Sequence, residues 1–147
     1  MVLALGSDHG GFRLKEEIKE FLIAKGIEFR DFGCYSTESC DYPDIAKEVA
    51  LAVKTEEYEL GLLFCGTGIG MSIAANKVSG IRAACCSDCF SVKYTRMHNN
   101  ANILCIGERV IGPGLAAELV EIFLSTEFEG GRHQRRVDKI AKLEAGL

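Results

Sequence analysis

The chain has 147 residues, of which 48% are hydrophobic and 26% are charged, and its formal net charge is −4. This composition is that of a globular chain long enough for one ordinary α/β domain, and it excludes a disordered protein. The absence of a basic surplus argues against a nucleic-acid partner. No apolar stretch approaches the roughly 18 residues that a membrane span needs, so we expect no membrane association.

The first half of the chain predicts strands and helices in alternation. A continuous apolar run at 2–6 is typical of a strand buried on both faces. Apolar residues at helical spacing from Leu14 to Leu22 predict a helix that ends before Gly26. A strand is expected at 27–32, and a second helix begins near Pro43.

The second half continues this alternation. It predicts strands at 60–64, 81–85 and 103–106, and helices near 71–76, 87–97, 115–123 and from about residue 132. Such alternation indicates βαβ units that build one parallel sheet with right-handed crossovers and helices on both faces. We find no internal repeat or linker, and we expect a single domain over residues 1–147.

Seven cysteines are present, an odd number, and several lie in apolar runs that predict strands. The chain opens with a strand-like stretch and shows no signal-peptide pattern. We therefore expect reduced thiols and a cytoplasmic location.

In open parallel sheets, ligands bind beyond the carboxyl ends of the strands, where the strand order reverses. Three polar segments are assigned to that edge by this rule: 7–11, 65–70, and the turn after the fourth helix at 98–100. We expect the chemistry of the protein in these three segments.

The segment from Cys65 to Gly70 holds three glycines at a strand-to-helix turn, where backbone N–H groups can converge on an anion. It is neither a dinucleotide fingerprint, since Met71 occupies the last position, nor a P-loop, since no Lys-Ser/Thr follows. A purely structural turn is the alternative. Cys65 precedes those N–H groups directly, so its thiol is a candidate nucleophile or base, although a cysteine at a strand end is often inert core.

Two arginines of the last predicted helix, Arg132 and Arg136, are four residues apart and share one helix face. Two guanidinium groups on one face suit a phosphate monoester, and a solvated basic face is the plain alternative. Arg109 follows the fifth strand and is a further candidate cation.

Other polar residues have plain structural explanations as well. Asp8 is in the position of a helix N-cap, and His98 is in that of a helix-end residue. Cys86 and Cys89 have the spacing of half a zinc site, but no second ligand pair has such spacing, so we expect no metal.

These motifs together resemble the type B ribose-5-phosphate isomerases, a family that also includes galactose-6-phosphate isomerase subunits. The matching segments follow one another in order over nearly the whole chain: 6–11, 41–43, 65–72, 96–99 and 129–133. The resemblance implies a Rossmann-like three-layer αβα sandwich with a five-stranded parallel sheet. It also implies a homodimer, or a tetramer built from dimers, whose active sites are shared between subunits.

The reaction implied by the resemblance is the interconversion of ribose 5-phosphate and ribulose 5-phosphate through an enediolate, in the pentose phosphate pathway, with no cofactor. Cys65 is the implied base that moves a proton between C2 and C1. Some relatives use a Glu elsewhere in the loop, with Ser where Cys stands here, but this loop has no acidic residue.

The remaining roles are carried over in the same way. The N–H groups of Gly66, Thr67, Gly68, Ile69 and Gly70, with the Thr67 hydroxyl, stabilise the enediolate. His98 helps to open the furanose ring, and Asp8 contacts the sugar hydroxyls. The phosphate region takes His9, Arg109, Arg132 and Arg136, and the pocket is lined by Asn99 and Tyr42.

Three alternatives stay open on the sequence. The substrate can be a six-carbon aldose phosphate such as allose or galactose 6-phosphate. The chain can be a phosphate-binding module without catalysis, which gives no reason for Cys65. It can also be a thiol redox protein that uses Cys86 and Cys89, which predicts a reactive Cys86 with a lowered pKa.

Overall fold

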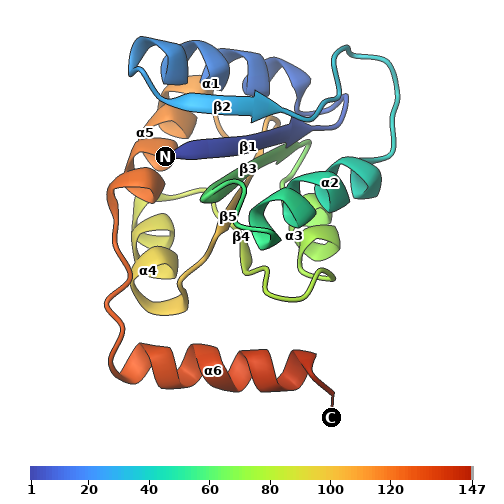
Figure 1. Cartoon of the computed structure of the whole chain (residues 1–147). Coiled ribbons are helices and arrows are strands. Elements are labelled where there is room, and N and C mark those ends of the chain that lie inside the picture. Colours follow the sequence, from blue (N-terminus) through green and yellow to red (C-terminus); the bar gives the residue numbers. More distant parts are fainter. Residues whose placement is uncertain (147) are drawn as a thin grey trace.

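The computed structural model describes residues 1–146, which form a central sheet flanked by helices (Figure 1). The elements in chain order are β1 (Val2–Ser7), α1 (Phe12–Ala24), β2 (Glu28–Asp31), α2 (Tyr42–Lys54), β3 (Leu60–Cys65), α3 (Ile69–Ala75), β4 (Ala83–Cys85), α4 (Cys89–Asn99), β5 (Ile103–Gly107), α5 (Pro113–Ser125) and α6 (Arg132–Glu144).

The sheet has the order β2-β1-β3-β5-β4, and all of its pairings are parallel. This confirms the predicted five-stranded parallel sheet. Strand β1 has β2 on one side and β3 on the other, so the direction of winding reverses at β1. The carboxyl ends of β1 and β3 therefore form the switch point at which such folds bind ligands.

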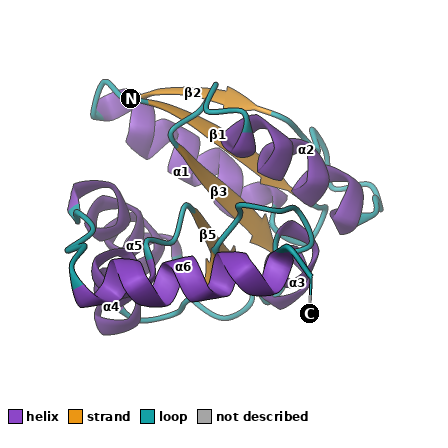
Figure 2. Cartoon of the chain, turned by 60° about the horizontal axis from the view of Figure 1, so that its bottom comes forward, coloured by secondary structure: helices purple, strands orange, loops and turns teal. Residues whose placement is uncertain are grey.

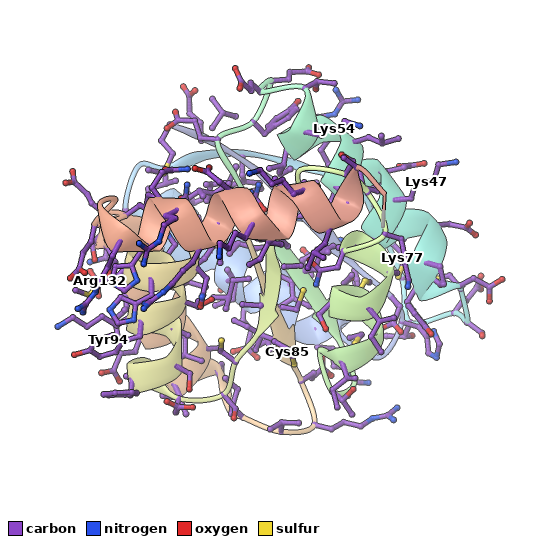
Figure 3. All side chains as sticks on the ribbon, turned by 90° about the horizontal axis from the view of Figure 1, so that it is seen from below. Lys47, Lys54, Lys77, Cys85, Tyr94 and Arg132 are labelled. Carbon is purple, nitrogen blue, oxygen red and sulfur yellow. The ribbon has the colours of Figure 1, made fainter. Side chains whose placement is uncertain are left out.

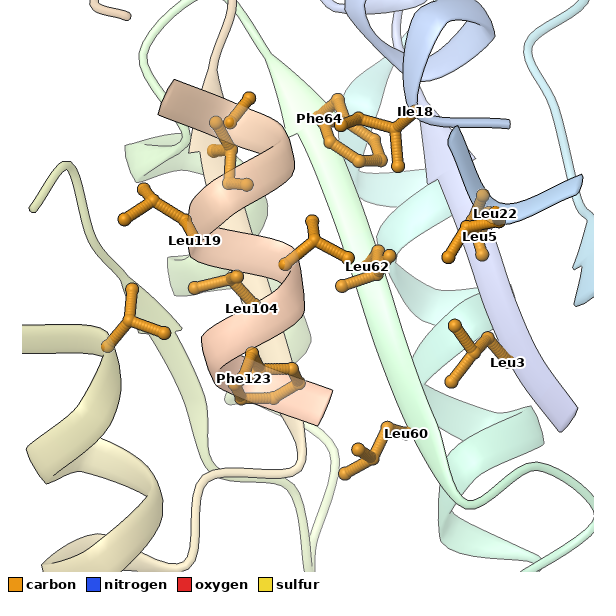
Figure 4. Packing of buried hydrophobic residues seen from close by; sticks show 14 of the residues in the cluster. Leu3, Leu5, Ile18, Leu22, Leu60, Leu62, Phe64, Leu104, Leu119 and Phe123 are labelled. Carbon is orange, nitrogen blue, oxygen red and sulfur yellow. The ribbon is translucent and has the colours of Figure 1, made fainter. Parts of the chain in front are cut away.

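Helices cover both faces of the sheet, and each face has its own apolar core. Leu62 and Phe64 of β3 pack with α1, α4 and α5, as Figure 4 shows for Phe64 beside Ile18 of α1. Leu63 and Cys65, which alternate with them, face α2 and α3. Strand β3 is buried along its whole length because both of its faces are covered, and this explains its continuous apolar run.

Helix α6 lies outside these layers and crosses the end of the molecule next to α4 (Figures 1 and 2). Only His133 and Val137 of this helix are buried. Its last turn is held by Glu144, whose Oε2 accepts a hydrogen bond from the N–H of Gly80 at 2.9 Å. The start predicted near residue 132 is confirmed.

Several predicted boundaries moved by two residues. Strand β4 begins at Ala83 and not at 81, because the Arg82 N–H bonds to the Asn102 side chain at 2.8 Å. Helix α4 ends at Asn99, two residues beyond the predicted end. Among residues 1–146, we find no helix that combines the length and the apolarity needed to cross a membrane.

Candidate active site

The loops after β1 and β3 touch at the switch point. The N–H of Asp8 donates to the carbonyl of Phe64 at 3.1 Å. A Cβ added at Gly11 would overlap the backbone of Phe64, so only glycine permits this approach. Two of the three predicted segments, 7–11 and 65–70, therefore form one continuous surface at the carboxyl edge.

Asp8 and His9 are fixed by backbone donors. Asp8 is 7% exposed, and its Oδ1 accepts hydrogen bonds from the N–H groups of Gly10 at 2.8 Å and Gly11 at 3.1 Å. Within residues 1–146 its Oδ2 accepts none, and this oxygen can take a sugar hydroxyl. His9 Nδ1 accepts from the N–H of Cys40 at 3.2 Å, which places its proton on Nε2 when the ring is neutral.

Cys65 ends β3 and is 5% exposed. Its Sγ accepts a hydrogen bond from the N–H of Gly68 at 3.0 Å. Gly68 adopts a φ of 80°, and a Cβ there would lie 3.0 Å from the Cys85 sulfur. The glycine at this position thus permits the turn that points a backbone donor at the Cys65 thiol.

The loop also presents donors that nothing in the described chain occupies. The Ile69 N–H bonds to Thr67 Oγ1 at 3.2 Å. By contrast, the N–H groups of Gly66, Thr67 and Gly70 make no hydrogen bond within residues 1–146. Unoccupied donors beside a thiol form a suitable place for a developing oxyanion.

Tyr42 and Arg109 flank the loop, as predicted. The Tyr42 ring packs on Gly70, where an added Cβ would lie 2.9 Å from Cζ. Arg109 is exposed and lies against Gly66, whose carbonyl accepts from the Arg109 N–H at 3.0 Å. The structure therefore brings nine predicted residues together at this edge: Asp8, His9, Tyr42, Cys65, Gly66, Thr67, Gly68, Gly70 and Arg109, with Ile69 exposed beside them.

The four other predicted residues, His98, Asn99, Arg132 and Arg136, lie elsewhere. The predicted placement of the turn at 98–100 at the carboxyl edge was wrong. His98 and Asn99 close α4, and the Asn100 carbonyl after them accepts from Arg82 Nε at 2.8 Å, just before β4 begins. The carbonyl of Asn102 accepts from the Gly61 N–H, near the start of β3, at 2.9 Å. The turn at 98–100 is thus at the amino edge of the sheet.

The reason is the direction of a crossover. Helix α4 leaves the carboxyl end of β4 and must bring the chain back to the amino end of β5, so a turn after a helix lies at the opposite edge. In the register of β3 with β5, Cys65 pairs with Gly107 and Gly61 pairs with Ile103. Four steps of about 3.3 Å give a separation of about 13 Å along the strands alone.

Arg132 and Arg136 lie on the same side of the molecule as His98 and Asn99, because α6 begins beside the end of α4 (Figure 3). Both arginines are exposed, whereas His133 and Val137 on the other face are buried. This agrees with the predicted shared face. One chain therefore carries two separate groups of candidate residues, at opposite edges of its sheet.

The sequence analysis missed two residues of the second group, Glu129 and His133. The ring of His98 stacks on that of His133, with centroids 4.0 Å apart and planes 7° from parallel. Oε2 of Glu129 lies 3.3 Å from His133 Nε2 and 3.8 Å from His98 Nε2. Both residues belong to the matching segment 129–133, which was a signal, but nothing in the sequence places that segment beside His98.

Residues 3–140 match the model of the Ribose/Galactose Isomerase family. The chain belongs to this family. Ribose-5-phosphate isomerase B of Escherichia coli is 49% identical over 142 residues, which cover 97% of this chain and 95% of that protein. A D-erythrulose-4-phosphate isomerase of Pectobacterium atrosepticum is 45% identical over 143 residues, covering 97% and 94%.

A solved structure of Clostridium thermocellum ribose-5-phosphate isomerase B superposes with a TM-score of 0.97 at 52% identity, covering 99% of this chain and 98% of that one. The expected Rossmann-like three-layer fold is therefore confirmed for this member of the isomerase family.

The thiols do not support the redox alternative. Burial raises the pKa of the Cys86 thiol to about 11, and burial together with Glu118 raises the pKa of the Cys89 thiol. The redox hypothesis predicts a lowered pKa for Cys86, and the raised pKa does not support that hypothesis. All seven cysteines are free.

Proposed function

We propose that this isomerase-family chain interconverts ribose 5-phosphate and ribulose 5-phosphate, with Cys65 as the base. The observation that carries the proposal is the buried Cys65 sulfur at the switch point, which receives the Gly68 N–H beside unoccupied backbone donors. The names and coverage of the relatives support the substrate. A phosphate-binding module would not need a thiol at this place.

In the proposed mechanism, the Cys65 thiolate removes the proton from C2 of the open aldose, and the electrons move into the C1 carbonyl to form an enediolate. The free N–H groups and the Thr67 hydroxyl stabilise the oxyanion, an effect of about 3–4 kcal/mol for a single donor. The resulting thiol returns the proton to C1, while a proton passes from O2 to O1. Asp8 holds sugar hydroxyls through its free Oδ2.

The second half of the site comes, in our proposal, from another copy of the chain in a homodimer. His98 and Asn99 lie at the amino edge of the sheet with α6 beside them, whereas the Cys65 loop of the same chain lies at the carboxyl edge. Exposed apolar residues surround that loop, with Ile69 55%, Ile73 58% and Val110 55% exposed, and a partner would cover them. Arg132 and Arg136 of the partner would then face the substrate phosphate, and Asn99 the sugar.

The substrate length is the point on which the family divides. The family description names galactose, and the Pectobacterium relative is named for a four-carbon ketose phosphate. We favour the five-carbon sugar because both the E. coli relative and the C. thermocellum structure carry the ribose name.

The test is a kinetic assay of purified protein on ribose 5-phosphate, allose 6-phosphate, galactose 6-phosphate and erythrose 4-phosphate, with EDTA present and no coenzyme. We expect the highest kcat/KM for ribose 5-phosphate. A higher value for another sugar would change the substrate but keep the reaction. Binding of these sugar phosphates without turnover would indicate a phosphate-binding module and not an enzyme.

A further inference from the structure

Three side chains from two separate parts of the chain meet at the end of α4. His98 is in the last turn of α4, Glu129 is in the connection between α5 and α6, and His133 is in the first turn of α6. Their ligand atoms all lie within 4.8 Å of one another. Neither Glu129 nor His133 has a role in the reaction as proposed above.

The backbone holds this cluster together. The N–H of Glu129 donates to the carbonyl of Met97 at 3.1 Å, which ties the connection to the last turn of α4. Gly130 and Gly131 then adopt φ values of 67° and 56°, which turn the chain into α6. His133 is 5% exposed as a result, whereas the side chain of His98 is 35% exposed.

The ring of His98 is confined on several sides. One face stacks on His133, and the Tyr94 ring makes an edge contact at 4.9 Å and 65°. Oε2 of Glu129 lies beside both rings, 3.3 Å from His133 Nε2 and 3.8 Å from His98 Nε2. The Nε of Arg132 donates to His133 Nε2 at 3.5 Å. A histidine near a helix end would otherwise sample several rotamers.

The two rings do not have the arrangement of a metal site. Two imidazoles that ligate one metal ion must direct their in-plane lone pairs to a common point. Rings that lie 7° from parallel direct them side by side, so a metal would require both rings to turn.

We propose that Glu129 and His133 are positioning residues that hold the imidazole of His98 for opening of the sugar ring. This inference rests on the role given to His98 in the proposed function. Opening breaks the bond between C1 and O4: O4 gains a proton, the anomeric hydroxyl loses one, and the C1 carbonyl forms. An imidazole held at a fixed angle can carry out one of these transfers, and general acid–base catalysis of this kind contributes about 10²–10⁴-fold.

A four-carbon substrate separates this role from all others. Ribose 5-phosphate closes its ring through O4, but O4 of erythrose 4-phosphate carries the phosphate and cannot close a furanose. Ring opening is therefore needed for the first substrate only, while both need the same base, oxyanion donors and phosphate contacts. The 45% identical Pectobacterium protein is named for the ketose of this four-carbon pair.

The experiment measures kcat/KM on both sugars for Glu129→Gln, His133→Gln and His98→Asn. The matched control is Glu127→Gln, an exposed carboxylate two residues before Glu129. We expect His98→Asn to lose about 10²-fold or more on ribose 5-phosphate, and Glu129→Gln and His133→Gln to lose about 10-fold, with less than 2-fold change on erythrose 4-phosphate. Glu129→Asp should recover part of the loss.

A second measurement reports on the cluster without turnover. The chain has 3 histidines, so imidazole ¹⁵N NMR gives one set of signals for each. Burial, together with the charges of His98 and Arg132, lowers the pKa of His133, and the Glu129 carboxylate offsets part of this effect. Glu129→Gln should therefore lower the titration midpoint of His133, and Glu127→Gln should leave it unchanged.

Equal losses on both sugars, or no loss, in Glu129→Gln and His133→Gln would overturn the positioning role. If erythrose 4-phosphate is not turned over, the NMR titration decides, and unchanged His98 and His133 signals in Glu129→Gln would overturn it. A His98→Asn variant with full activity on ribose 5-phosphate would instead remove the ring-opening role from His98 and leave the Cys65 chemistry standing.

Discussion

The N–H of Gly68 points at the sulfur of Cys65 from 3.0 Å, across a turn of three residues. This contact couples the base of the proposed reaction to the backbone that carries the oxyanion donors. The contact fixes the position of the sulfur relative to those donors. One loop therefore holds both the base and the donors that stabilise the oxyanion.

Replacing Cys65 by Ser should abolish most turnover, because a hydroxyl is a much weaker base than a thiolate at neutral pH. We expect kcat on ribose 5-phosphate to fall by about 10²–10⁴-fold with little change in substrate binding. Cys89→Ser at the start of α4 is the control. Full kcat in Cys65→Ser would assign the base to another group.

Gly68→Ala should impair both the loop and the reaction. The new Cβ would have to accept a φ of 80° and would lie 3.0 Å from the Cys85 sulfur and 3.1 Å from the Ile106 carbonyl carbon. Gly80→Ala is a matched control, since Gly80 has a φ of 86° but nothing within 4 Å of its added Cβ.

The strain of a positive φ costs about 1–2 kcal/mol in both variants. Urea unfolding should therefore show a larger loss for Gly68→Ala, and only that variant should lose kcat, by about 10-fold or more. Similar stability and similar kcat in the two variants would show that the close approach of Gly68 to Cys85 and Ile106 is unimportant.

Arg136→Ala should raise KM by about 10–100-fold, the range for loss of a hydrogen bond to a charged group, with kcat nearly kept. Arg135→Ala, on a different face of α6, is the control. Unchanged KM in Arg136→Ala would take this arginine out of the phosphate site.

The same variant tests whether two chains share each site. A dimer of one Cys65→Ser chain and one Arg136→Ala chain has one site with both defects and one intact site. At substrate concentrations well below KM, where both variants have little activity, random reassortment of the two should therefore restore roughly a quarter of the wild-type activity. No recovery after subunit exchange would mean that one chain supplies both groups of residues.

Asp31→Asn should destabilise the fold by about 3–5 kcal/mol, because it leaves a buried charge without its partner. Lys15 is 0% exposed, and its Nζ contacts Asp31 Oδ1 at 2.7 Å and the Cys34 carbonyl at 2.6 Å. Glu16 is a half-buried neighbour that pairs with Lys19 at 2.9 Å, and Glu16→Gln should cost only about 0–1 kcal/mol. Urea titrations at pH 7 compare the two variants.

The pH dependence of this ion pair follows from its pKa. Burial alone would raise the pKa of Asp31, but hydrogen bonds from Lys15, the Gly33 N–H and Lys19 outweigh it and lower the pKa below its ordinary value. The unfolded chain then binds the proton more readily, so the stabilisation is present above the ordinary carboxyl pKa and is lost as the pH falls through the folded value. Asp31→Asn should show less of this acid-dependent loss than the wild type.

The fold followed from local patterns because each strand and helix had its own periodic signal and turn residues. The strands β1, β3 and β5 lie within one or two residues of their predicted bounds. The first half of the site was predictable for the same reason, since Asp8 directly follows β1 and Cys65 is the last residue of β3.

The second half was misplaced because the rule for strand ends was applied to a helix end. His98 follows α4, and a crossover helix reverses the direction of the chain. The stacking of His98 on His133 could not be predicted, because the two residues are brought together only by the tertiary packing of α6 on α4. Sequence patterns with short periods contain no information about such contacts.

The placement of α6 beside α4, away from the Cys65 loop, has a consequence for how the activity is switched on. In the proposed function, a single folded chain lacks the ring-opening histidine and the phosphate-binding arginines beside its own Cys65 loop. If a partner supplies them, specific activity depends on the enzyme's own concentration, and dilution below the dissociation constant of the dimer silences the enzyme without unfolding it.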